Sequence, residues 1–287
     1  MDVSSATWSG STGVFRQSDI WEGKIGMFAR ASKKVDDKYI IRGSLLYEIE
    51  EKKYTFVSNS GEKMAYKYDR FLFIAGNAID LKVYIVSAKK VDGGWKYEFV
   101  YTDEWDRIFF VDPPAIGRNF VLMNVENVDG KGEQEILYAN VNDWEIKKLG
   151  TGIILYPQIY DDVAYFVQKS TVWACDLSKS PSSIESDCMR VNQEGVKATA
   201  PAVNKQNPKK VIYSYGDGYY QLYMADMTEE TTTYQKIDIE RPSDLISYAP
   251  SQWDGDILVL EEFYVFSEGN YDFRSRACFQ SDNTLTI

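Results

Sequence analysis

The chain contains the run Lys210-Val211-Ile212-Tyr213-Ser214, in which a charged residue precedes a short segment of β-branched and aromatic residues. Five other segments repeat this pattern of a polar or charged residue before an apolar run. They are Lys24-Ile25-Gly26-Met27-Phe28, Arg70-Phe71-Leu72-Phe73-Ile74, Asn119-Phe120-Val121-Leu122-Met123, Asp162-Val163-Ala164-Tyr165-Phe166 and Asp256-Ile257-Leu258-Val259-Leu260. The first apolar residues fall at positions 25, 71, 120, 163, 211 and 257, so the spacing stays between 43 and 49 residues. A fixed period of this length indicates a repeat architecture.

Further strands are expected around each run. A second strand follows most runs, at residues 83–86, 136–139, 172–175 and 222–225, and an alternating third strand comes next, at residues 95–101, 144–149 and 234–239. Continuous apolar runs are typical of strands covered on both faces, whereas alternating segments have one face exposed to solvent. A strand before the run, as at residues 153–156 and 200–203, brings the count to four per repeat. The order from buried to exposed is typical of a propeller blade.

We therefore expect an all-β fold, namely a six-bladed β-propeller of four-stranded antiparallel blades, with five or seven blades as the alternatives. A single domain would span residues 1–287. Residues 1–22 can supply the first strand of the first blade and close the ring.

Composition supports this expectation and excludes other classes of protein. Aromatic residues make up 15% of the chain, which suits pleated, half-buried surfaces. The longest apolar runs, such as Phe71-Leu72-Phe73-Ile74-Ala75, are far shorter than the roughly 20 residues that cross a bilayer. The net charge of −11 argues against nucleic acid as a partner and against insertion into a membrane. The acidic surface mainly indicates solubility.

The cysteines bear on the cellular compartment. The start Met1-Asp2-Val3-Ser4-Ser5 has no signal-peptide pattern, so we expect either a cytosolic chain or a mature secreted form with an added Met1. Cys175 and Cys188 flank a polar segment between two expected strands, where a cross-strand disulfide can form. A disulfide favours a secreted, cell-surface or periplasmic protein. The alternative is two unconnected buried thiols, and Cys278 is expected to be a small core residue.

One repeat resembles a known family. The repeat combines Pro201-Ala202-Val203, the run at residues 207–214, Gly216-Asp217-Gly218, and Gln221-Leu222-Tyr223-Met224-Ala225-Asp226. It resembles a blade of the TolB-like propellers. In this chain, Pro157, Pro201 and Pro250 recur at the same phase of successive repeats. This resemblance implies the fold. The family includes partner-binding proteins, peptidase gating domains and carbohydrate-active relatives, so it does not imply one function.

The chain has no histidine, which excludes several kinds of catalytic and metal site from it. A Ser-His-Asp triad, a Cys-His pair and a histidine-ligated zinc site all need that side chain. No cofactor is expected. The alternative function, a glycosidase-like carbohydrate-active enzyme, needs only two carboxylates over the channel mouth. Acidic residues are plentiful, but nothing in the sequence marks two of them as a pair, so we lean against an enzyme.

Calcium is the remaining candidate metal. The segment from Asn127 to Ile136 resembles the oxygen-rich loops of integrin-type propellers, and Asn127, Asp129 and Glu135 can supply hard ligands. Lys131, however, occupies the central ligand position. A tight Asp-Gly hairpin turn therefore explains the segment better, and we expect no metal.

The loops on one rim are the expected binding site, because propeller loops vary independently of the scaffold. Exposed Trp, Tyr and Arg are typical of the centres of interfaces. The expected ligand-binding residues are Trp105, Asp106, Arg107, Tyr215, Asp217, Tyr219 and Arg241. We expect a binding or scaffold module whose partner is a protein, a peptide or a glycan. The alternative is that Trp105 and Tyr219 pack between blades.

Overall fold

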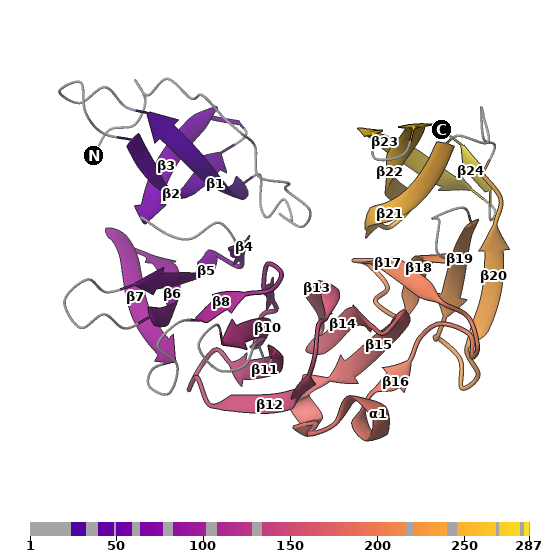
Figure 1. Ribbon diagram of the computed structural model, residues 1–287, viewed down its shortest axis with the longest axis horizontal. Coiled ribbons are helices and arrows are strands. Elements are labelled where there is room, and N and C mark those ends of the chain that lie inside the picture. The colour runs from indigo at the N-terminus through magenta and orange to yellow at the C-terminus, as the bar shows by residue number, and fades with distance from the viewer. Residues whose placement is uncertain are drawn as a thin grey trace. The chain divides into compact units, whose positions relative to one another are not determined.

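A computed structural model gives the fold and describes residues 24–32, 40–48, 50–58, 64–76, 83–101, 108–127, 134–215, 221–239, 246–267, 270–281 and 284–286. The contacts within the chain divide it into two units, Met1–Ile153 and Ile154–Ile287. Three antiparallel sheets are described in each unit, and we number them sheets 1 to 6 in chain order (Figure 1).

In sheets 1 and 2 of the first unit, strands that follow one another in the sequence are also paired with one another. Sheet 1 consists of β1 (Lys24–Ser32), β2 (Ile40–Glu48) and β3 (Lys53–Ser58). Sheet 2 consists of β4 (Ala65–Lys67), β5 (Arg70–Gly76), β6 (Val83–Val91) and β7 (Gly94–Tyr101). Sheet 3 consists of β8 (Ile108–Phe110), β9 (Ala115–Ile116), β10 (Phe120–Asn127), β11 (Gln134–Asn140) and β12 (Ile146–Thr151).

The second unit repeats this arrangement three times with four strands per sheet. Sheet 4 consists of β13 (Leu155–Tyr160), β14 (Val163–Gln168), β15 (Thr171–Asp176) and β16 (Met189–Arg190). Sheet 5 consists of β17 (Ala198–Val203), β18 (Lys210–Tyr215), β19 (Gln221–Asp226) and β20 (Thr233–Ile237). Sheet 6 consists of β21 (Ile246–Asp254), β22 (Ile257–Ser267), β23 (Asn270–Ser281) and β24 (Thr284–Thr286). The first strands β13, β17 and β21 are neighbours in space.

The six repeated runs of the sequence fall in six different sheets, in β1, β5, β10, β14, β18 and β22. In sheets 2 to 6 the run forms a strand that pairs with an earlier strand of the same sheet, as the four-strand repeat predicts. Residues 1–22, expected to contribute the first strand and the ring closure, lie outside the described residues. The number of blades in a closed ring and the single domain stay predictions.

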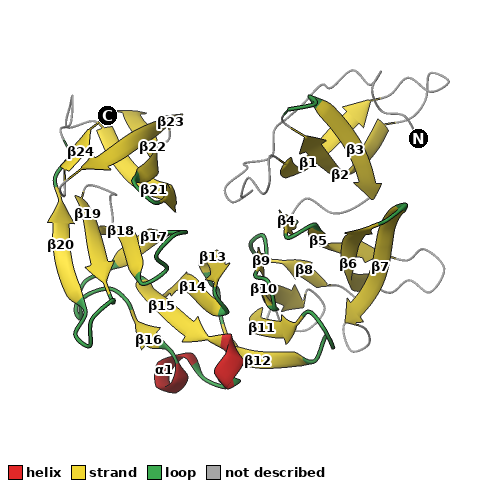
Figure 2. Cartoon of the chain, turned by 180° about the vertical axis from the view of Figure 1, so that it is seen from behind, coloured by secondary structure: helices red, strands yellow, loops and turns green. Residues whose placement is uncertain are grey.

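Helix is scarce in the described part of the chain, as expected. Figure 2 shows two short helical segments between β15 and β16, the 3-10 turn η1 (Leu177–Lys179) and the helix α1 (Ile184–Asp187). The sequence predicted only a polar loop here. The Asp176 side chain accepts a hydrogen bond from the backbone N–H of Ser178, which caps η1.

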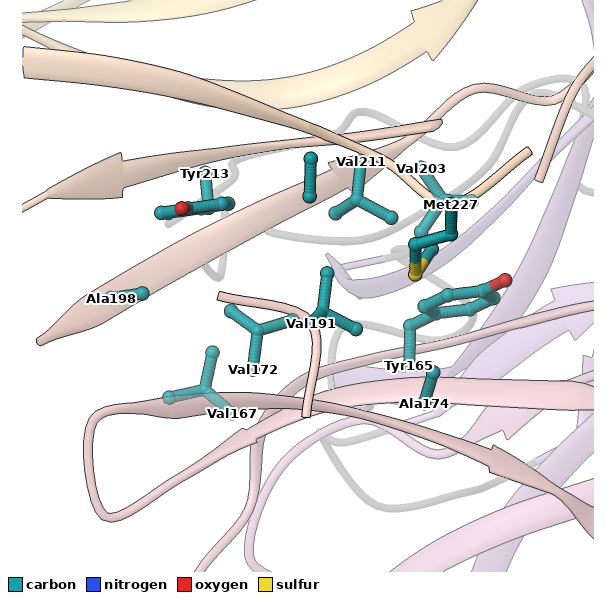
Figure 3. Packing of buried hydrophobic residues seen from close by; sticks show 11 residues of the cluster. Tyr165, Val167, Val172, Ala174, Val191, Ala198, Val203, Val211, Tyr213 and Met227 are labelled. Carbon is teal, nitrogen blue, oxygen red and sulfur yellow. The ribbon is translucent and has the colours of Figure 1, made fainter. Parts of the chain in front are cut away.

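The hydrophobic core is divided between the spaces that separate neighbouring sheets. In β18, Val211 and Tyr213 pack with sheet 4, whereas Ile212 packs on the opposite side with Trp253 and Leu260 of sheet 6. Figure 3 shows the side chains that pack between sheets 4 and 5. The run is continuously apolar because both faces of the strand are covered by neighbouring sheets. Each such buried aliphatic side chain contributes roughly 1.5 to 3 kcal/mol to stability.

The three prolines that recur in the second unit mark irregularities in the first strands. The register of pairing shifts in β13 around Pro157, in β17 around Pro201, and in β21 at Pro250. Proline has no N–H to donate to the ladder, so a bulge accommodates it. Tyr156 and Ala200, which precede two of these prolines, have positive φ values of 54° and 46°.

Sheet 3 differs from the predicted four-strand repeat in a related way. Pro113 and Pro114 lie between β8 and β9, and both of these short strands pair with β10. Two prolines in succession remove two N–H donors, so the first strand is divided in two.

Candidate binding site

Tyr215 is the one expected ligand-binding residue that lies within the described part of the chain. It ends β18 and is 39% exposed. Its ring makes an edge contact with the ring of Tyr223 on β19, with the centroids 5.5 Å apart. Residues 216–220, which include Asp217 and Tyr219, follow it directly in the sequence. The exposed ring therefore stands at the beginning of a predicted binding loop.

Tyr215 belongs to a ladder of tyrosines on one face of sheet 5. Tyr213 is paired with Tyr223 across β18 and β19, and their rings are stacked with centroids 6.3 Å apart. Tyr234, on the outer strand β20, is 38% exposed. The ladder thus runs from a fully buried ring, Tyr213, to rings that solvent reaches. Aromatic cross-strand pairs of this kind stabilise a sheet and fix the positions of their rings.

Tyr213 anchors the ladder in the core between sheets 4 and 5. Burial raises the pKa of Tyr213 to about 12, and a hydrogen bond from the backbone N–H of Gln193 opposes this rise. The phenol is therefore neutral at physiological pH. The buried ring of Tyr213 stacks on Tyr223, whose ring in turn contacts that of Tyr215.

The remaining expected ligand-binding residues lie outside the described residues. They are Trp105, Asp106, Arg107, Asp217, Tyr219 and Arg241. Their roles stay predictions.

The candidate calcium loop is only partly described. Asp129 lies outside the described residues, and Asn127 is described only as the last residue of β10. The Glu135 carboxylate accepts a hydrogen bond from the ammonium of Lys148 at 2.6 Å. Among the described residues, no group of three or more Cys, Asp or Glu is placed to hold a metal.

The expected disulfide between Cys175 and Cys188 is confirmed. Ala174 on β15 pairs with Met189 on β16, so the two cysteines lie beside the last pair of this ladder. The bond closes the segment that contains η1 and α1. No helix in the described part of the chain is long and apolar enough to cross a bilayer.

Four of the described carboxylates have shifted pKa values. A general acid needs a raised pKa. The pKa values of Glu98, Asp176, Asp187 and Asp226 are all lowered instead. For Glu98, the hydrogen bond from Lys96 is the largest cause.

A polar cluster between sheets 2 and 3 was not anticipated from the sequence. Arg70 is buried at the start of β5, donates to the Ser87 hydroxyl at 2.6 Å, and lies 3.8 Å from the Glu98 carboxylate. Its guanidinium also lies 5.1 Å from the ring centroid of Trp144, whose Nε1 donates to Glu98. Burial lowers the pKa of Arg70, and the charge of Glu98 opposes this effect. The one signal in the sequence was the charged residue at the start of the run.

Comparison with known proteins gives likeness in structure only. No family model matches the chain, and no curated protein matches it in sequence. The chain is similar to the acylaminoacyl peptidase of Pyrococcus horikoshii, with a TM-score of 0.57 and 8% identity over 91% of this chain and 45% of that chain. It is also similar to oligopeptidase B from Leishmania major, with a TM-score of 0.56 and 8% identity over 92% of this chain and 38% of that chain. TolB from Acinetobacter baumannii matches with a TM-score of 0.49 and 11% identity, over 88% of this chain and 63% of that chain.

The fold is a β-propeller. The predicted all-β, TolB-like propeller architecture is confirmed, while the number of blades stays a prediction. Identities of 8% to 11% show likeness of fold alone. The propeller chain spans less than two thirds of the length of each of these three proteins.

Proposed function

We propose that this chain is a partner-binding propeller that recognises a protein, a peptide or a glycan through loops on one rim, around Tyr215. The observation that carries the proposal is the tyrosine ladder of sheet 5, which ends in the exposed ring of Tyr215 at the start of residues 216–220. A tyrosine ring offers apolar area together with a hydroxyl. It therefore suits both the ring of a sugar and the side chains of a peptide.

The loop residues predicted from the sequence complete the proposed site. Asp217 and Tyr219 follow Tyr215 in the chain, while Trp105, Asp106, Arg107 and Arg241 belong to two further loops. Aromatic rings and guanidinium groups are typical of the centres of protein interfaces.

We also propose that the protein works outside the cytosol, in a secreted, cell-surface or periplasmic setting. The Cys175–Cys188 disulfide supports this location, because such bonds persist in oxidising compartments. Mass spectrometry of material from the native source, with free thiols blocked, should find this crosslink. Alkylation of both cysteines in that material would contradict the proposed location.

A peptidase activity does not follow from the likeness in fold to the two peptidases. The chain contains no histidine, so a Ser-His-Asp triad could not be formed from its residues alone. A binding role requires no such group.

The proposed site is tested by screening the purified chain against a glycan array and a peptide library, and then comparing variants on the ligand found. Tyr215→Ala should raise the dissociation constant roughly 10- to 30-fold, as removal of an aromatic at the centre of an interface does. Tyr215→Phe separates the ring from the hydroxyl. Ile257→Ala is the control, because Ile257 is similarly exposed, at 45%, on another sheet. Unchanged affinity of Tyr215→Ala would contradict the proposed site.

A further inference from the structure

The outer strand of sheet 2 carries two exposed aromatic side chains. β7 is eight residues long and forms the edge of sheet 2 in the described part of the chain. Phe99 is 66% exposed and Tyr97 is 44% exposed, and both lie on the face of the strand that also carries Trp95. A long, aromatic edge strand is a template for pairing with another strand.

The other face of β7 carries charges of both signs. The Lys96 ammonium donates to the Glu98 carboxylate at 2.8 Å, and the Lys96 side chain is 65% exposed. Lys96 is also opposite Lys89 across β6 and β7, which places two like charges side by side. A lysine in an edge strand normally opposes pairing with a neutral strand. A partner strand that brings a carboxylate opposite Lys96 removes this obstacle.

The sequence of β7 supplies such a partner when two copies of the strand meet antiparallel. A two-fold axis perpendicular to the sheet must pass midway between a residue and its own copy in the second strand. With the axis at Tyr97, Lys96 of one copy is opposite Glu98 of the other, and the reverse pair repeats this contact. On the opposite face, Trp95 is opposite Phe99 of the second copy. Opposite charges and aromatic residues are both favourable cross-strand pairs.

The two neighbouring symmetric registers are unfavourable. With the axis at Glu98, the two Glu98 carboxylates would be opposite each other. With the axis at Lys96, the two ammonium groups would be opposite each other. Like charges directly opposite destabilise a strand pair. The alternation of charge therefore selects the register centred on Tyr97.

We propose that this chain forms a two-fold symmetric dimer in which β7 of one copy pairs antiparallel with β7 of a second copy, with Tyr97 on the axis. The occupant of the edge is a second copy of this chain, because the charge pattern of the strand complements itself. The same patch of both copies is used, as in most closed homodimers. Pairing through one strand per copy gives a small interface, so we expect the dimer to exchange with monomer on dilution.

Sedimentation velocity and light scattering over a dilution series test the dimer. The wild-type mass should rise with concentration from 32.9 kDa toward twice that value. Lys96→Glu places a carboxylate opposite Glu98 at two symmetric contacts and should weaken the dimer roughly 100-fold. Salt at about 1 M, where the Debye length is about 3 Å, should reduce this difference. A wild-type mass that stays at 32.9 kDa at every concentration overturns the proposal.

A matched control keeps the result specific to β7. Lys236 lies on β20, the edge strand of sheet 5 in the described part of the chain, and pairs with Asp238 two residues later at 3.4 Å. Its side chain is 49% exposed, so Lys236→Glu makes the same change of charge in a similar setting. This variant should dimerise as the wild type does. If it weakens association as much as Lys96→Glu does, net charge rather than β7 is responsible, and the proposal fails.

A crosslink tests the register. Tyr97→Cys places two identical thiols opposite each other across the axis, where a mild oxidant should join two chains. Lys96→Cys places its thiol opposite Glu98 of the second copy and should not crosslink. Both variants keep the native cysteines, so the wild-type chain is oxidised alongside them. Crosslinking of Lys96→Cys in preference to Tyr97→Cys would contradict this register, and circular dichroism confirms that each variant is folded.

Discussion

The outer edges of sheets 2 and 4 are secured in different ways. In sheet 4 the edge strand β16 is only two residues long, and the Cys175–Cys188 disulfide lies next to its pairing with β15. In sheet 2 the edge strand β7 is eight residues long, and Glu98 links it to Arg70 in β5 and to Trp144, which lies between β11 and β12. One edge is held by a covalent bond and the other by a network of charges and hydrogen bonds.

This difference follows from the number of backbone hydrogen bonds that each edge strand can form with its neighbour. A two-residue strand forms too few hydrogen bonds to resist fraying, so a covalent restraint contributes most there. A long strand is held by its ladder, and polar contacts to the next sheet then fix its orientation. The two edges should therefore respond to different conditions, the first to loss of the disulfide and the second to acid.

The largest effect is expected at sheet 4. Replacing both Cys175 and Cys188 by serine removes a bond between residues 13 positions apart and should lower the free energy of unfolding by about 2 to 3 kcal/mol. Urea denaturation measures the change, and hydrogen exchange should show faster opening of β16. Cys278→Ser is the control and should leave exchange in sheet 4 unchanged. Equal stability of the double variant and the wild type would show that the disulfide does not secure this edge.

A smaller effect is expected at sheet 2. Glu98→Gln keeps an acceptor for Trp144 but removes the charge that faces the buried Arg70, so we expect a loss of about 1 to 2 kcal/mol. Glu145→Gln is the control, because Glu145 pairs with Lys147 at 3.4 Å while 67% exposed, where an ion pair contributes little. Urea denaturation of both variants gives the comparison. An equal loss in the two variants would mean that burial of Arg70 adds nothing to the network.

The strands and the disulfide could be predicted from the sequence because they depend on local signals. The runs at β14 and β18 carry the apolar pattern of strands covered on both faces, and the cysteines flank a short polar segment. The helix α1 was missed, because four residues carry too little periodicity to indicate a helix.

The polar cluster at sheets 2 and 3 could not be predicted in the same way. The contact between Arg70 and Trp144 depends on how two sheets stack, and no local pattern encodes that distance. For the candidate site, Tyr215 was predicted as a rim residue, whereas its support by Tyr213 and Tyr223 was not. Side-chain stacking across strands follows from register, which the sequence leaves open until the loops between strands are known.

The smallest effect is the dependence of the sheet 2 network on pH. Hydrogen bonds from Lys96 and Trp144, together with the charges of Lys96 and Arg70, lower the pKa of Glu98 below its ordinary value of 4.5, against the opposing effect of burial. Because the folded pKa is the lower one, the unfolded chain binds the proton first as pH falls. The stability that Glu98 contributes is therefore complete above about 4.5 and is lost as pH falls through the folded pKa. Urea denaturation at a series of pH values should show the wild type and Glu98→Gln converging in acid. The disulfide double variant should stay less stable than the wild type by the same amount throughout, and a Glu98→Gln difference that persists to low pH would contradict an ionic role for Glu98.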